Sequence, residues 1–258
     1  MKKPNILITN DDGVNASGIK YLCKALEDIA TVTVVAPITE RSASGMGLTV
    51  RHPLHLQEHH WSEKARIYSV TGTPADCIKM ALSVVLDSTP DLVVSGINRG
   101  SNAGRNAIYS GTVAGTIEGA LRGIPGIAFS CVSSSKPYYD TASRFVPRIV
   151  EHVLSTPLNP GTVLNVNVPS RKYEDIVGMR VTRQGLGYWI EDPEKRVHPA
   201  GEPYYWLGGK LIDHHEDEGR DTDLLEQGYL TATPLHVSEL TDHLEVEKRQ
   251  KSFSKLMT

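Results

Sequence analysis

The chain has 258 residues, of which 40% are hydrophobic, 22% are charged and 6% are aromatic, and its formal net charge is -3 at pH 7. At roughly 150 residues per domain, this length predicts one large domain or two small ones, with enough apolar residues for a sizeable core. The nearly balanced charge argues against a protein built around nucleic acid, because such proteins usually carry a basic surplus.

Strands and helices alternate along the first two-thirds of the chain. Short apolar or β-branched runs predict strands at 5–10, 31–37, 90–96, 124–132 and 162–169. Apolar residues at helical spacing, together with start signals, predict helices at 17–30, 72–86, 112–123 and 138–155. The stretches 47–58 and 65–70 predict further strands, which we expect to join the sheet as antiparallel additions.

The helix at 72–86 has the clearest start. Thr73 suits the N-cap, Pro74 the first helical position and Asp76 the first turn. Strands and helices that alternate in this way predict an α/β fold, a Rossmann-like three-layer sandwich with a mostly parallel central sheet. In such sheets ligands bind at the carboxyl ends of the strands.

The character of the sequence changes after Pro169. Residues 170–230 are polar, and "GLGYWIEDPE" (185–194) and "PYYWLGGKLID" (203–213) predict an aromatic hairpin. The stretch 228–235 predicts one more strand, and the last residues a peripheral segment. We therefore expect a Rossmann-like catalytic core at 1–169 and a β-rich C-terminal extension at 170–258 that makes oligomer contacts and returns to the core.

The three cysteines, Cys23, Cys77 and Cys131, lie far apart and lack CxxC spacing. This pattern suits a reducing cytosol, and we expect each cysteine to behave as a small buried hydrophobe. No stretch approaches the about 20 apolar residues of a membrane helix, and the N-terminal apolar run is too short for a signal peptide. We therefore expect a soluble, cytoplasmic protein without a membrane or nucleic-acid partner.

Two carboxylates, Asp11 and Asp12, stand side by side directly after the first predicted strand. The stretch "NDDG" has the composition of a turn in which one Asp caps the next helix. The alternative is a hard divalent cation such as Mg²⁺ or Mn²⁺, which takes oxygen ligands and removes the repulsion between the two acids. Such a cation usually serves phosphate chemistry.

Two later loops carry residues that suit this chemistry. Ser42 and Asn98 also follow predicted strands, so we expect them to converge with Asp11 on one edge of the sheet. The stretch "SGINRGSNAG" (95–104) places Asn98 and Asn102 among glycines, which let backbone N–H groups approach an anion. Ser110, Gly111 and Thr112 begin the next helix, whose N-terminus favours a phosphate, and N-capping by Ser110 is compatible with that role.

Other nucleotide and phosphoryl-transfer layouts fit less well. A haloacid-dehalogenase-type phosphatase needs Asp-x-Asp, whereas the two acids here are adjacent. A response-regulator receiver needs an acceptor Asp on a later central strand, where this chain has Ser95 and Asn98. The Walker sequence GxxxxGK[ST] and the dinucleotide fingerprint GxGxxG are both absent.

Five stretches in this order resemble the survival protein E (SurE) family of metal-dependent nucleotidases. They are "ILITNDDGVNASGI" (6–19), "APITERSASG" (36–45), "VTGTPADC" (70–77), "SGINRGSNAG" with "IYSGTVAGTIEG" (95–119), and "TDLLEQGYLTATPL" (222–235). The resemblance implies a hydrolase that removes phosphate from nucleoside 5′- or 3′-monophosphates, with short polyphosphate as a further candidate substrate. It also implies one divalent cation, Mg²⁺ or Mn²⁺, and a homodimer or homotetramer with exchanged C-terminal segments.

The resemblance also assigns roles to single residues. The metal ligands are Asp11, Asp12, Ser42 and Asn98, with Ser44 as a competitor for the role of Ser42. The phosphate-binding residues are Asn98, Asn102, Ser110, Gly111 and Thr112. Asp11 and Asp12 are the catalytic candidates: we favour Asp11 as base and metal ligand over a covalent aspartyl-phosphate, and expect Asp12 to hold the metal.

One other function and two other groups of residues were considered. A non-catalytic, metal-assisted nucleotide-binding module would carry the same loops, and the effect of a chelator on ligand affinity distinguishes it from an enzyme. The histidine pairs His59–His60 and His214–His215 suggest a metal site, but neighbours on a strand point to opposite faces, so we do not expect paired ligation. We expect Glu118 to form an ion pair with Arg122, four residues further along the helix.

Overall fold

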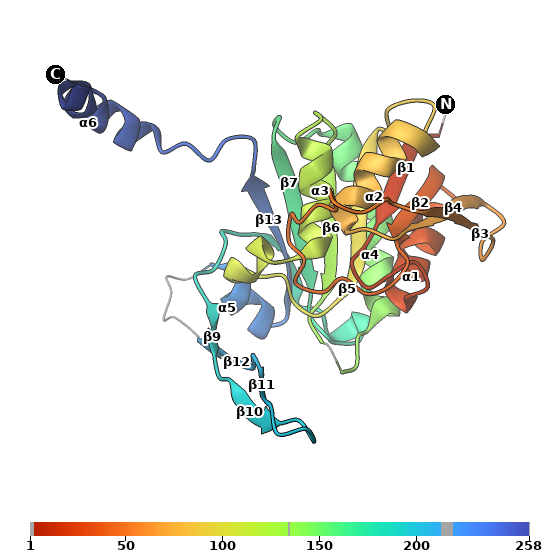
Figure 1. The fold of residues 1–258 in the computed structure, drawn as a ribbon. Coiled ribbons are helices and arrows are strands. Elements are labelled where there is room, and N and C mark those ends of the chain that lie inside the picture. The colour runs from red at the N-terminus through yellow and green to blue at the C-terminus, as the bar shows by residue number, and fades with distance from the viewer. Residues whose placement is uncertain (1–2, 134, 213–218, 258) are drawn as a thin grey trace.

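The computed structural model describes residues 3–133, 135–212 and 219–257 (Figure 1). Within them, one nine-stranded sheet has the strand order β3-β4-β2-β1-β5-β6-β7-β13-β8. Its strands are β1 (Asn5–Thr9), β2 (Thr31–Pro37), β3 (Leu56–His59), β4 (Ala65–Val70), β5 (Leu92–Arg99), β6 (Gly126–Cys131), β7 (Thr162–Val168), β8 (Gly178–Val181) and β13 (Tyr229–His236). The strands predicted at 5–10, 31–37, 65–70, 90–96, 124–132 and 162–169 are present, whereas of the stretch 47–58 only Leu56–Glu58 lie in a strand, β3.

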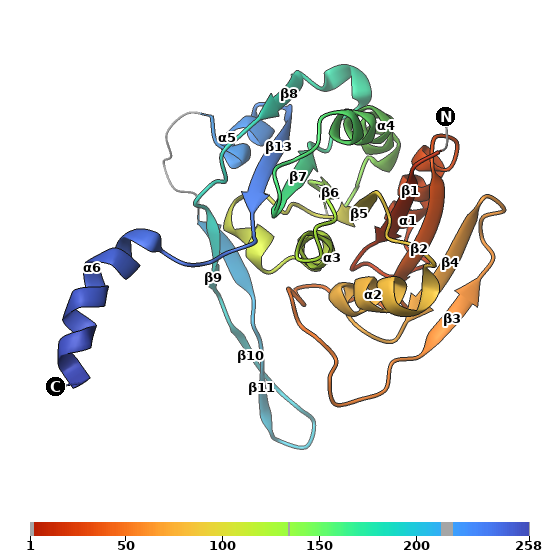
Figure 2. The ribbon, with the colours of Figure 1, turned by 90° about the horizontal axis from the view of Figure 1, so that it is seen from above.

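Helices cover both faces of this sheet. The helices are α1 (Ser17–Leu26), α2 (Pro74–Met80), α3 (Gly111–Ala120), α4 (Tyr139–Ser155), α5 (Asp221–Glu226) and α6 (His243–Phe253), with a π-helical turn at Ala81–Val85 and short 3₁₀-helices at Gly104–Ile108 (η2), Tyr173–Asp175 and Ser254–Met257. Helices α1 and α4 pack together over one face, and α2 and α3 over the other (Figure 2). The predicted three-layer α/β sandwich with a mostly parallel sheet is therefore confirmed. Every helix in the described part of the chain is too short or too polar to cross a lipid bilayer.

Strand directions differ from the prediction at one place. Strands β1, β2, β4, β5, β6 and β7 run parallel, so β4 is not an antiparallel addition, and only β3 is antiparallel to its neighbour β4. The sequence of β4 alone does not reveal this, because a β-branched run has the same composition in either direction. Strand β13 is antiparallel to β7 and parallel to β8.

Local signals predicted the helix starts well. Thr73 caps α2 in a reciprocal capping box with Asp76, and Pro74 occupies the first turn. The three cysteines are buried and unpaired, as expected. Helix α3 packs closely on the sheet because it has glycines where a side chain would collide: a Cβ on Gly115 would lie 2.6 Å from Thr9 Cγ2. This close approach brings the N-terminus of α3 beside the end of β1.

The C-terminal part adds an arm and a projecting helix. Strands β9 (Tyr188–Glu191) and β12 (Gly209–Ile212) pair, as do β10 (Glu194–Val197) and β11 (Pro203–Trp206), so the predicted hairpin is confirmed up to residue 212. Its expected last residue, Asp213, lies outside the described residues. Helix α6, which the sequence did not predict, lies away from the sheet at the end of an extended segment (Figure 1).

Candidate functional site

A pocket of about 560 Å³ opens at the carboxyl ends of β1 and β5. Five of the sequence-predicted site residues line it: Asp11, Ser42, Asn98, Asn102 and Ser110. The opposite wall comes from the hairpin, through Ile190, Glu191 and Leu207–Gly209. We call these five residues the hairpin wall. Chain segments far apart in sequence therefore form one cavity, of a size typical for small-molecule sites.

Neither aspartate of the "NDDG" stretch builds the turn. The Asn10 side chain does so, accepting from the Gly13 N–H at 3.2 Å and donating to the Gly13 carbonyl at 3.0 Å. Gly13 supplies the left-handed backbone, with φ of 102°. Helix α1 begins after Ala16 without a side-chain cap. The "NDDG" stretch is therefore a turn, as its composition predicts, but neither aspartate caps α1, and both carboxylates remain for another role.

Asp11 is buried, with 5% of its surface exposed. The Thr112 hydroxyl donates to Asp11 Oδ1 at 2.5 Å. Burial raises the pKa of Asp11 to about 6; the hydrogen bond from Thr112 opposes this rise, and the charge of Asp12 adds to it. The helix start at Gly111 is packed against the same carboxylate, since a Cβ there would lie 2.7 Å from Asp11 Cβ.

Asp12 lines a second pocket, which Glu40, Arg99 and Tyr139 also line. Its Oδ2 accepts a hydrogen bond from the Arg99 backbone N–H at 3.0 Å. Burial raises the pKa of Asp12, although the N–H and the positive charge of Arg99 act in the other direction. Arg99 lines both pockets and so lies between the two carboxylates' surroundings.

Ser42 and Ser44 differ in how they are held. The Ser42 hydroxyl donates to Glu40 Oε1 at 2.6 Å, and Glu40 Oε2 lies 3.5 Å from Arg99 Nη2. The Ser44 hydroxyl is buried and has no hydrogen-bond partner among the described residues. It lies beside the helix start, because a Cβ on Gly111 would be 2.9 Å from Ser44 Oγ. The Ser44 hydroxyl is therefore available to donate to a group bound at the start of α3.

Asn98 does not lie in a loop, as expected, but in β5, which continues to Arg99. The pairing of β5 with β6 shifts register between Ser95 and Asn98, so the strand could not be followed from its apolar pattern alone. The Asn98 amide nitrogen donates to the Gly100 carbonyl at 2.9 Å, which leaves the amide oxygen for a ligand.

Asn102 is held from the protein interior. Its amide nitrogen donates to Ser130 Oγ at 2.7 Å, its backbone N–H donates to Asn167 Oδ1 at 2.9 Å, and its carbonyl accepts from Asn165 Nδ2 at 2.9 Å. The strands β6 and β7 thus fix this part of the loop. At the next element Ser110 caps α3, accepting from the Val113 N–H at 3.1 Å, so the predicted N-cap is confirmed.

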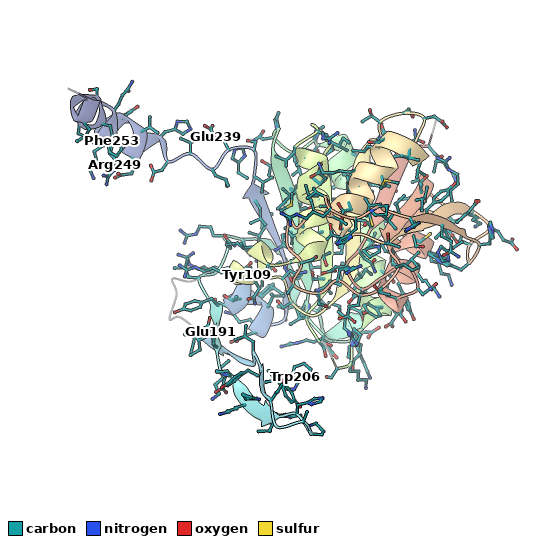
Figure 3. The ribbon with its side chains drawn as sticks, viewed as in Figure 1. Tyr109, Glu191, Trp206, Glu239, Arg249 and Phe253 are labelled. Carbon is teal, nitrogen blue, oxygen red and sulfur yellow. The ribbon has the colours of Figure 1, made fainter. Side chains whose placement is uncertain are left out.

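Sequence reasoning missed the residues that reach the pocket only through the tertiary fold. They are Arg99 and the hairpin wall in the main pocket, and Glu40 in the second pocket. Tyr109 and Glu191 lie on different elements beside the pocket (Figure 3), and Tyr109 is 66% exposed. No local pattern marks them, because their neighbours are distant in sequence.

The remaining polar clusters have structural partners. His59 Nε2 lies 2.8 Å from Ser69 Oγ, and His214–His215 lies outside the described residues. Among the residues described, no group of three or more His, Cys, Asp or Glu side chains could hold a metal ion. Glu118 does pair with Arg122, at 3.6 Å, but its closer partner is Lys79, at 2.7 Å.

Comparisons with known proteins agree on one family. The family model described as "Survival protein SurE" matches residues 6–191. The 5′-nucleotidase SurE of Protochlamydia amoebophila is 50% identical over 253 residues, covering 97% of each protein. That of Thermosipho africanus is 46% identical over 233 residues, covering 90% of this chain and 91% of the relative. The crystal structure of the SurE protein from Aquifex aeolicus matches with a TM-score of 0.82 and 38% identity, over 99% of this chain and 100% of that one.

Proposed function

The chain belongs to the SurE family, and from this premise and the geometry of the pocket we propose that it hydrolyses nucleoside 5′-monophosphates to nucleoside and phosphate. One observation carries this function. The buried Asp11 carboxylate, the Asn98 amide and the capped start of α3 line a single pocket. A helix N-terminus attracts a phosphate, and a volume of about 560 Å³ suits a mononucleotide.

A divalent cation, Mg²⁺ or Mn²⁺, would be held by Asp11, Asp12, Ser42 and Asn98. The donor set fits such an ion. The side chain of Asn10, and not those of the two aspartates, closes the turn, and the Asn98 amide donates to Gly100 through its nitrogen, which leaves its oxygen for a ligand. The Ser42 hydroxyl donates a hydrogen bond to Glu40, which leaves its oxygen lone pairs for a ligand. Oxygen donors with two carboxylates suit Mg²⁺ or Mn²⁺ better than softer metals. When bound, the cation supplies positive charge against the charge that develops on the phosphate.

The residues of the pocket would have two roles, activation of the water and placement of the phosphate. Asp11 holds the attacking water and takes its proton; the hydrogen bond from Thr112 fixes one carboxylate oxygen and leaves the other for that task. Asn98, Asn102, Ser110, Gly111 and Thr112 place the phosphate at the start of α3. Action on 3′-monophosphates and on short polyphosphate belongs to the same proposal, because the pocket is open and not closed around one ester.

The C-terminal extension would form the contacts between subunits. We divide the chain into a catalytic core at 1–169 and an oligomerisation extension at 170–258. Helix α6 and the segment before it expose large apolar side chains away from the sheet, among them Leu240 (95%), Leu244 (78%) and Phe253 (59%) (Figure 3). Apolar groups on an isolated helix favour burial against a second copy, as a homodimer or homotetramer with exchanged C-terminal segments. The three unpaired cysteines support a cytoplasmic location.

Phosphate release from a panel of nucleoside monophosphates tests the activity. The panel is run with Mn²⁺, with Mg²⁺ and with a chelator. Phosphate release that requires the metal, and whose rate differs among the nucleotides, supports the proposed hydrolase. Nucleotide binding without any release, by folded protein with metal present, would support a non-catalytic binding module instead.

A further inference from the structure

Asp221 is a fully buried carboxylate outside the site described so far, at 0% exposure. It is the first residue of α5, and its side chain accepts from several backbone groups. Oδ1 accepts from the N–H groups of Gly185 (2.7 Å) and Thr222 (2.8 Å), and Gly104 N–H lies 3.2 Å from Oδ1 and 3.1 Å from Oδ2. The Thr233 hydroxyl reaches Oδ2 at 3.4 Å. No salt bridge to Asp221 is formed within the described ranges, so neutral donors alone compensate its burial.

The donors to Asp221 belong to the two walls of the pocket. Gly104 begins η2, between the pocket residues Asn102 and Asn106. Gly185 precedes β9, which carries Ile190 and Glu191 of the hairpin wall. The Asp221 carboxylate therefore connects the Asn102–Asn106 loop to the segment that leads into β9 of the hairpin.

Further hydrogen bonds connect residues 104–105 to residues 184–187, and we call this contact the junction. Gln184 Nε2 donates to the Gly104 carbonyl at 2.9 Å, and the Arg105 N–H donates to the Gly187 carbonyl at 3.2 Å. A Cβ on Gly185 would lie 2.9 Å from Asp221 Oδ1 and 2.6 Å from Thr222 Oγ1. The Gly185 end therefore lacks room for a side chain, and at Gly104 an added Cβ would lie 3.2 Å from the Gly187 carbonyl oxygen.

Burying a carboxylate without a cation is costly, and such a group is kept where its acceptor pattern is needed. Burial raises the pKa of Asp221, and the N–H groups of Gly104 and Gly185 oppose that rise. A carboxylate only accepts, whereas an amide would turn an NH₂ group toward N–H donors. A carboxylate therefore suits this position, because it offers an acceptor oxygen both to the Gly104 N–H and to the Gly185 N–H.

We propose that Asp221 is a positioning residue that holds the hairpin wall in register with the Asn102–Asn106 loop, so that the nucleoside and the phosphate of one substrate are bound together. This role rests on the proposed function. The phosphate end keeps its own support when Asp221 is changed, because Asn165 and Asn167 of β7 hold the Asn102 backbone independently. Loss of Asp221 should therefore displace the nucleoside side of the pocket more than the phosphate side.

The test compares Asp221→Asn on two substrates, a nucleoside 5′-monophosphate and para-nitrophenyl phosphate, a smaller ester that carries no nucleoside. We expect KM for the nucleotide to rise about tenfold, the effect of one charge-assisted hydrogen bond, with kcat for both esters and KM for the small ester nearly unchanged. Amide hydrogen exchange should accelerate in peptides that contain Gly104 and Gly185 but not in β1. Asp223→Asn is the matched control, since that carboxylate on the same helix accepts only from Gln227 at the surface.

Equal losses on both esters, or unchanged exchange at Gly104 and Gly185, would overturn the role and leave Asp221 as a folding residue. If Asp221→Asn does not fold, Gln184→Met removes the other side-chain bond to the Gly104 peptide and must show the same split between substrates. Failure of the proposed function is separate: wild-type protein would then release phosphate from neither ester, while the exchange measurement still reports whether Asp221 holds the two walls together.

Discussion

The Thr112 hydroxyl donates a hydrogen bond of 2.5 Å to the Asp11 carboxylate, although the two residues stand 101 positions apart. Asp11 lies at the end of β1, and Thr112 lies in the first turn of α3. The bond ties the helix start that would bind phosphate to the carboxylate that would activate water. Each group therefore determines the orientation of the other.

Replacing Thr112 by Val should separate these two groups at nearly constant volume. A hydrogen bond to a charged group contributes about 1.5–3 kcal/mol, so we expect kcat/KM for nucleotide hydrolysis to fall roughly 10- to 100-fold. Thr112→Ser keeps the hydroxyl and should stay close to wild type. The measurement is steady-state phosphate release by both variants, and a Val variant as active as the Ser variant would contradict the role of the bond.

Asp12→Asn should abolish most phosphate release and weaken Mn²⁺ binding while the fold survives. The amide keeps the acceptor for the Arg99 N–H but loses the negative charge that the cation needs. We expect a loss of at least about 100-fold in kcat/KM at limiting metal. Asp28→Asn is the control, since its side chain is 74% exposed on the surface. Full activity with unchanged metal affinity, by titration calorimetry, would remove Asp12 from the ligand set.

Ser42→Ala and Ser44→Ala should affect different measurements. Ser42 donates to Glu40 and offers its oxygen to the cation, so its loss should weaken Mn²⁺ binding by a few-fold to about tenfold. Ser44 has an unpaired hydroxyl beside Gly111, so its loss should raise KM for the nucleotide and leave Mn²⁺ affinity unchanged. The reverse result would identify Ser44 as the metal ligand and Ser42 as the phosphate contact.

Asp76→Asn should destabilise the fold in a pH-dependent way. Burial raises the pKa of Asp76, but hydrogen bonds from Thr73 and Thr49 outweigh this effect and hold the pKa below 3.8. A lowered carboxyl pKa contributes stability above the unfolded value, and this stability is lost as pH falls through the folded value. We expect a loss of about 1–3 kcal/mol in the free energy of unfolding near neutral pH.

The measurement for Asp76 is urea unfolding of wild type and variant at about pH 7 and about pH 3. The difference between the two proteins in free energy of unfolding should narrow as pH falls, because the lowered pKa of Asp76 contributes stability that is lost when its carboxylate takes up a proton. A difference that stays constant across the two pH values would show that the shape of the cap, and not its charge, supplies the stability.

Deleting residues 240–258 should reduce the size of the particle in solution. The deletion removes α6 with the exposed Leu240, Leu244 and Phe253, and leaves β13 in the sheet. Sedimentation velocity should then report a smaller species than the full chain. A truncated protein with an unchanged assembly state would place the interface elsewhere, with the exposed Tyr205 and Trp206 of the hairpin as the next candidates.

Local signals explain how far the fold could be predicted. The bounds of β2 and the start of α2 follow from β-branched residues and from a capping box, which act within a few residues. The direction of β4 and the extension of β5 to Arg99 depend on pairing with distant strands, so they were predicted wrongly. Helix α6 was missed because its few apolar residues make no helical face against a core.

The candidate site was predictable where it lies at strand ends. Asp11, Ser42 and Asn98 meet because parallel strands bring their carboxyl ends to one edge. Glu40 and Arg99 could not be predicted, because the contact of the Glu40 side chain with Ser42 and that of the Arg99 backbone N–H with Asp12 depend on the tertiary fold. The hairpin wall and Asp221 could not be predicted, since their places depend on how the last third of the chain returns to the sheet.

The position of β13 between β7 and β8 has a consequence for synthesis on the ribosome. Chains emerge from the N-terminus, and early segments begin to fold while later ones are still being made. Strands β1 to β7 are available once residue 168 has emerged, whereas Asp221 and β13 arrive more than fifty residues later. Until then β7 keeps an open edge, and Gly104 lacks its carboxylate partner. A nascent chain thus has its aspartate pair in place before it has a complete pocket, because the hairpin wall is tied to Gly104 only after Asp221 has emerged.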